Sequence, residues 1–95
     1  MKRDDFIFTI GYAGGTAIVD RDARKRHGGK GAGELLDAGL YRAAFCAALY
    51  DGEVEAFVER YRAASGDNQA TAETLKRQFG VFDVADDGTS VSAIG

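Results

Sequence analysis

The sequence contains no proline and no tryptophan, and it has only one cysteine and one histidine among 95 residues. Proline normally makes up about 5% of a protein, so its absence excludes proline-rich linkers and native cis-prolyl bonds. A single cysteine cannot form an intramolecular disulfide, which is typical of a reducing compartment. We therefore expect a cytoplasmic protein. Thirteen glycines supply almost all of the breaks between structural elements.

Long hydrophobic segments are also absent from the sequence. No segment approaches the roughly 18 consecutive apolar residues that indicate a membrane-spanning helix, and the apolar stretch 6–10 is too short for a signal peptide. Hydrophobic residues make up 45% of the chain and charged residues 28%, which is typical of a folded globular protein. We predict that residues 1–95 form a single domain that does not contact a membrane.

Charge is distributed unevenly along the chain. Residues 1–30 carry seven basic and four acidic side chains, whereas residues 31–95 carry five basic and eleven acidic ones. The acidic total argues against a dedicated nucleic-acid binder, because such domains are usually basic. The asymmetry suits self-association, in which the basic segment of one copy meets acidic helices of another. Two independently solvated faces are the alternative.

The first predicted element is an N-terminal β-hairpin. Residues 6–12 are rich in β-branched and aromatic side chains, which is typical of a strand. Gly14-Gly15 can form a tight turn, and residues 17–19 would then form the returning strand. One face of the first strand would carry Phe6, Phe8, Ile10 and Tyr12. Of these, Phe6, Phe8 and Ile10 are expected in the core.

A second hairpin is predicted at the C-terminal end. The segment Asp86-Asp87-Gly88-Thr89 has the composition of a hairpin turn and separates the short alternating runs 81–84 and 90–94. An isolated hairpin is marginally stable. We therefore expect the two hairpins to join into one antiparallel sheet.

Three or four helices are predicted between the hairpins, after a short helical turn that Asp20 would cap. The segment 43–50 contains eight apolar residues without a charge, which indicates a central buried helix. The segment 53–64 is amphipathic, because its apolar residues recur at the spacing of one helical face. The other helical segments are 34–40 and 71–79. The predicted fold is α+β, with the helices packed on one face of the sheet.

The clearest local feature is a basic, glycine-rich segment at residues 21–33. Such a segment, when it leads into a helix, can present backbone N–H groups to a phosphate. The segment is not a P-loop, because no Lys-Ser or Lys-Thr follows the required glycine spacing. It is not G-x-G-x-x-G either, since Leu36 stands at the third glycine position. The alternative is a solvated loop without a ligand. The candidate anion- or partner-binding residues are Arg21, Arg24, Lys25, Arg26, His27 and Lys30.

No catalytic motif is visible in the sequence. Histidine often serves as a general acid or base in enzymes, but no serine or cysteine lies near His27 in the chain. Cys46 lies within an apolar segment, where a cysteine normally behaves as a small buried hydrophobe. The acidic residues at 51–53 and 86–88 lack the spacing of a calcium-binding loop. We therefore predict no metal site and no cofactor, and a non-catalytic role is favoured over an enzyme.

The favoured function is a small interaction or regulatory module that forms a homodimer or binds another protein. Two hairpins leave sheet edges exposed, and the chain has no proline to block them. The alternative function is binding of an anionic ligand, a nucleotide or a nucleic acid by residues 21–33.

Overall fold

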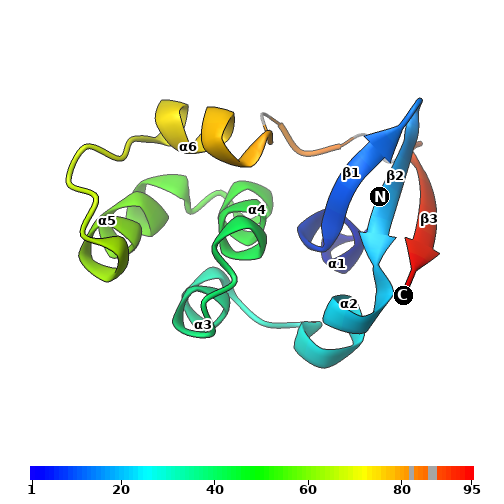
Figure 1. The fold of residues 1–95 in the computed structure, drawn as a ribbon, viewed down its shortest axis with the longest axis horizontal. Helices are drawn as coiled ribbons and strands as arrows, with labels where there is room; N and C mark the ends of the chain where they lie inside the picture. Colours follow the sequence, from blue (N-terminus) through cyan, green and yellow to red (C-terminus); the bar gives the residue numbers. More distant parts are fainter. Residues whose placement is uncertain (82, 86–87) are drawn as a thin grey trace.

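A computed structural model describes residues 1–81, 83–85 and 88–95 and shows an α+β fold. Within these residues there are six helices and three strands. The sheet lies at one end of the molecule, helices α3–α6 lie at the other, and α1 lies between them (Figure 1). The elements are α1 (Arg3–Ile7), β1 (Thr9–Ala13), β2 (Thr16–Asp20), α2 (Arg21–His27), α3 (Ala32–Asp37), α4 (Tyr41–Asp51), α5 (Val54–Ser65), α6 (Ala72–Phe79) and β3 (Ser90–Ile94).

The centre of the hydrophobic core lies among the helices. Phe45 of α4 is fully buried, and its ring centroid lies 5.7 Å from that of Phe57 in α5 and 5.5 Å from that of Phe79 in α6. The residues of α4 from Ala44 to Ala48 are all buried. The prediction of a central buried helix is therefore confirmed.

Residues 6–8 differ from the sequence-based prediction. They form the end of α1 and its C-terminal cap, and the strand begins only at Thr9. Phe6, Ile7 and Phe8 are all buried. Successive residues of a strand point to opposite faces, so a strand at the margin of the fold would have buried only part of this run. One helical turn that packs against α4 buries all three side chains.

The N-terminal hairpin is confirmed, but its core-facing residues are not all as predicted. β1 and β2 pair in antiparallel fashion, with Ala13 opposite Thr16, and Gly14 takes the positive φ of +62° that this turn requires. The register shifts between Thr9 and Gly11. This bulge places Ile10 on the surface, 57% exposed. The prediction that Ile10 lies in the core is wrong.

The predicted C-terminal hairpin is wrong in the part that the structure describes. β3 pairs with β2 in parallel, so the sheet is mixed and its order is β1-β2-β3. Val81, Asp83 and Val84 form no strand, while Phe82 and the turn residues Asp86 and Asp87 lie outside the described residues. A parallel neighbour requires a long crossover, and helices α2–α6 supply it.

Two helix boundaries follow the signals in the sequence. Asp20 caps α2, because its Oδ1 accepts a hydrogen bond from the backbone N–H of Ala23 at 3.0 Å. Thr71 caps the start of α6, because its hydroxyl accepts a hydrogen bond from the backbone N–H of Thr74, and Gly80, with φ +67°, caps its end. These local boundaries confirm the predicted N-terminal cap at Asp20 and the helix predicted at 71–79.

Candidate functional site

The basic, glycine-rich segment packs against the acidic first turn of α1. Arg24 forms an ion pair with Asp5. The backbone N–H of Gly29 donates to Oδ1 of Asp4 at 3.2 Å. A guanidinium and a backbone N–H are the groups that would hold a phosphate. In this protein, the carboxylates of Asp5 and Asp4 already bind the guanidinium of Arg24 and the N–H of Gly29.

The other predicted binding residues do not converge on one place. Nζ of Lys30 lies 3.0 Å from Nδ1 of His27. Arg21 reaches β3, where its Nη2 donates to the carbonyl of Ala93 at 3.2 Å. Lys25 and Arg26 are exposed on α2, and their side chains make no hydrogen bond or ion pair with any described residue.

An open polar hollow of about 770 Å³ lies between α1 and the glycine-rich turn. On its wall, Arg3 donates to Asp51 through Nε and Nη2, at 3.0 and 2.8 Å, and to the carbonyl of Lys30 at 3.1 Å. The hydrogen bond between Arg3 and Asp51 raises the pKa of Arg3 and lowers the pKa of Asp51. Arg24, also on the wall, is paired with Asp5. Each of the two arginines that line the hollow therefore already has a carboxylate as its ion-pair partner.

Arg42 joins the sheet to the helices. Its guanidinium donates to the carbonyl of Thr9 in β1, and its Nε donates to the carbonyl of Phe79 at 3.2 Å. It lies between an apolar pocket of about 260 Å³, which also borders Ile10 and Tyr41, and a smaller pocket of about 170 Å³. Arg42 thus satisfies a carbonyl at the end of α6 and another on the edge of β1.

Cys46 borders the smaller pocket but is fully buried. Burial raises the pKa of its thiol to about 11, and the charge of Arg42 lowers it in part. The thiolate is the reactive form of cysteine, so this residue is not a nucleophile near neutral pH.

Comparison with known proteins gives no assignment. No family model, curated protein or solved structure matches this chain significantly. Within the described ranges, no helix is long and apolar enough to cross a membrane. In the same residues, no three His, Cys, Asp or Glu side chains are grouped so that they could hold a metal ion.

Exposed apolar side chains gather on the two edge strands. Seven large hydrophobic residues are exposed in the described part of the chain, and four of them lie on β1 or β3. These four are Ile10, Tyr12, Val91 and Ile94. More than half of these exposed residues thus lie on the two edge strands, which are the candidate functional site.

The two edges of the sheet are protected to different degrees. β1 carries a bulge at Ile10, and Arg42 covers the carbonyl of Thr9. β3 pairs with β2 in unbroken register from Ser90 to Ile94 and contains no charged residue. Bulges and charges are the usual means by which edge strands avoid pairing with other chains. Arg21 contacts the carbonyl of Ala93 on β3, but this strand has neither a bulge nor a charge of its own, so β3 is the more open edge.

Sequence reasoning missed Arg42 altogether and assigned Arg21 to a different role. Arg42 binds the carbonyl of a residue 33 positions away, and Arg21 binds one 72 positions away. No local pattern signals such contacts, because a backbone carbonyl looks the same at every position of the sequence. The alternating run 90–94 was the only sequence signal for this edge.

Proposed function

We propose that this protein is a small non-catalytic interaction module that associates with a second copy of itself through the edge of β3. The observation that supports the proposal is that β3 is an edge strand with exposed apolar side chains and no charge. Among the described residues, β3 pairs with β2 alone, and it is uncharged and five residues long. Two of its apolar side chains, Val91 and Ile94, are 38% and 49% exposed.

The backbone of an open edge strand favours a strand as its partner. Its unpaired N–H and C=O groups are a template for a strand from another chain. Two-fold symmetric dimers are the commonest oligomers, and in them each copy presents the same surface. Pairing of five residues buries a small area, which is typical of weak or transient complexes. We therefore expect a dimer that forms at micromolar concentrations.

Binding of an anionic ligand, a nucleotide or a nucleic acid by residues 21–33 has less support. Arg24 and the N–H of Gly29 are bound by Asp5 and Asp4. A phosphate would have to displace two carboxylates that are tethered next to their partners.

Light scattering over a range of concentrations tests the proposal. The expected mass rises to twice the 10.1 kDa of one chain. Pairing along β3 should depend little on salt, whereas contact between basic and acidic surfaces should weaken as salt screens exposed charges. A monomer at both low and high salt would overturn the proposal and would favour the alternative function, binding of an anionic ligand by residues 21–33.

Substitutions locate the surface that is responsible. Val91→Lys should weaken association, because a charge on the edge must be desolvated when a second strand pairs there. Val84→Lys is the matched control, since Val84 is 41% exposed but lies outside the sheet. Equal effects of the two substitutions would exclude β3 as the interface.

A further inference from the structure

We infer that two copies join β3 to β3 in an antiparallel register centred on Ser92, and that Arg21 releases the carbonyl of Ala93 when this register forms. The inference rests on the proposed self-association and specifies its geometry. Three features of the sheet lead to it: the direction of the backbone groups, the match of the two faces, and the position of Arg21.

The direction of the backbone groups in β2 follows from its pairing with β1. The backbone N–H of Asp20 donates to the carbonyl of Phe8 at 2.9 Å, so the backbone groups of Asp20 point toward β1. These groups alternate in direction along a strand. Those of Ala17 and Val19 therefore point toward β3.

The same alternation fixes which groups of β3 are open. Val91 lies opposite Ala17, and Ala93 lies opposite Val19. In a parallel pair, only one member of each opposed pair turns its backbone groups toward the other strand. Val91 and Ala93 consequently turn theirs away from β2. The contact between Nη2 of Arg21 and the carbonyl of Ala93 agrees with this direction.

These open groups restrict the antiparallel register. In a hydrogen-bonded antiparallel pair, two directly opposed residues exchange both bonds, so each outward-facing residue must meet another. Centring the pair on Ser92 places Val91 opposite the partner's Ala93, and Ala93 opposite the partner's Val91. All five residues of β3 are then paired, and the two Ser92 residues face each other as a close, non-hydrogen-bonded pair.

The two faces of the joined sheet also match in this register. Tyr12, Ala17 and Val91 are directly opposed across β1, β2 and β3, so they share one face. The partner's Ala93 would extend this apolar row into the second sheet. A shift of one residue would place Val91 opposite a serine of the other face, because side chains alternate with a period of two.

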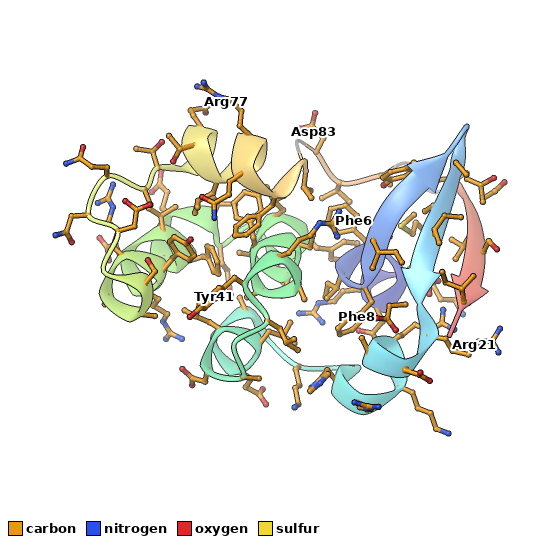
Figure 2. All side chains as sticks on the ribbon, viewed as in Figure 1. Phe6, Phe8, Arg21, Tyr41, Arg77 and Asp83 are labelled. Atoms are coloured by element: carbon orange, nitrogen blue, oxygen red, sulfur yellow. The ribbon has the colours of Figure 1, made fainter. Side chains whose placement is uncertain are left out.

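Arg21 controls access to the edge. Figure 2 shows Arg21 beside the C-terminal end of β3, where its Nη2 donates to the carbonyl of Ala93 at 3.2 Å. The partner's Val91 needs that same carbonyl in the register centred on Ser92. Arg21 is exposed and makes this hydrogen bond from the surface, so it acts as a weak and reversible cover.

Disulfide trapping tests the register. Opposed residues of a non-hydrogen-bonded pair have Cα atoms about 4.5 Å apart, which lies within the range that a disulfide spans. Ser92→Cys should therefore form a covalent dimer under mild oxidation. Ser90→Cys is the matched control, because its two copies would lie roughly 13 Å apart along the strands. The native Cys46 is fully buried and should not contribute.

Sedimentation equilibrium tests the role of Arg21. Arg21→Ala should tighten the dimer roughly two- to tenfold, the equivalent of removing one competing hydrogen bond. Arg26→Ala removes the same charge from the exposed surface of the same helix and should change the dissociation constant less than about twofold. The unfolding midpoint of each variant should remain close to that of the parent chain. Equal dissociation constants for the two variants would overturn the role of Arg21.

Self-association and the β3–β3 register can be disproved separately. If the parent chain is a dimer but Ser92→Cys forms a disulfide no faster than Ser90→Cys, the register is wrong and self-association stands. If the parent chain remains a monomer at every concentration, both the register and the proposed function are overturned. Selective trapping of Ser92→Cys supports both.

Discussion

Arg3 and Asp51 form a two-point ion pair that ties α1 to the last residue of α4. The two Arg3 nitrogens, Nε and Nη2, lie 3.0 and 2.8 Å from the two carboxylate oxygens of Asp51. The side chains are 26% and 29% exposed, so water still reaches them. This bidentate geometry fixes orientation as well as distance. It holds α1 where Phe6 and Ile7 enter the core.

The Arg3–Asp51 pair should make stability depend on pH. Asp51→Asn should reduce the free energy of unfolding by about 0.5–1 kcal/mol near neutral pH, as expected for a partly exposed pair. The hydrogen bond from Arg3 lowers the pKa of Asp51 below its ordinary value of 3.8. The stabilisation is therefore complete above pH 3.8 and is lost as the pH falls through the lowered pKa of the folded state.

Urea titrations near pH 7 and at about pH 2 measure this dependence. Asp37→Asn is the control, because Asp37 is exposed and its side chain has no hydrogen bond or ion pair among the described residues. A difference between Asp51→Asn and the parent chain that persisted unchanged in acid would contradict an ionic origin.

Phe57 should be among the most sensitive positions of the core. Its side chain is buried between Phe45 and Tyr61, with ring centroids at 5.7 and 5.9 Å. Phe57→Ala should cost about 3–5 kcal/mol, because it removes apolar burial and leaves a cavity. The midpoint of denaturant unfolding measures the loss. Arg77→Ala, at an exposed position that Figure 2 shows on the surface of α6, should leave the midpoint nearly unchanged.

Arg42 should stabilise the junction between β1 and α6. Arg42→Met should cost about 1–3 kcal/mol, because the carbonyls of Thr9 and Phe79 lose their donors in a partly buried place. Arg42→Lys should recover only part of this loss, since an ammonium group lacks the planar fork that serves two separated carbonyls. Equal stability of Arg42→Lys and the parent chain, measured by urea unfolding, would show that charge alone is sufficient.

Cys46 should be unreactive while the protein is folded. Its thiol is fully buried and its pKa is raised to about 11, so the reactive thiolate is scarce and inaccessible near pH 8. A chromogenic disulfide reagent should label it only after denaturant is added. Rapid labelling without denaturant would indicate that α4 opens to solvent in the native state.

Several elements could be predicted because their causes are local. The spacing of apolar residues in 53–64 predicts α5, and Asp20 and Gly80 mark helix ends through their own backbone and side-chain chemistry. The hairpin turn at Gly14 is equally local, since it needs only a residue that adopts positive φ. Each of these features depends on groups within a few positions of one another.

The tertiary structure alone decided the rest. The run Phe6–Phe8 suits a strand by composition, but α4 offers a surface that buries all three side chains only from a helical turn. The parallel pairing of β3 depends on where the helices return the chain, which no property of residues 90–94 specifies. The basic residues of 21–30 resembled one site in the sequence, yet Asp4, Asp5 and Ala93 divide them among separate contacts. Contacts between residues distant in sequence depend on how the complete surfaces of the helices and strands pack together, and a local sequence pattern does not contain that information.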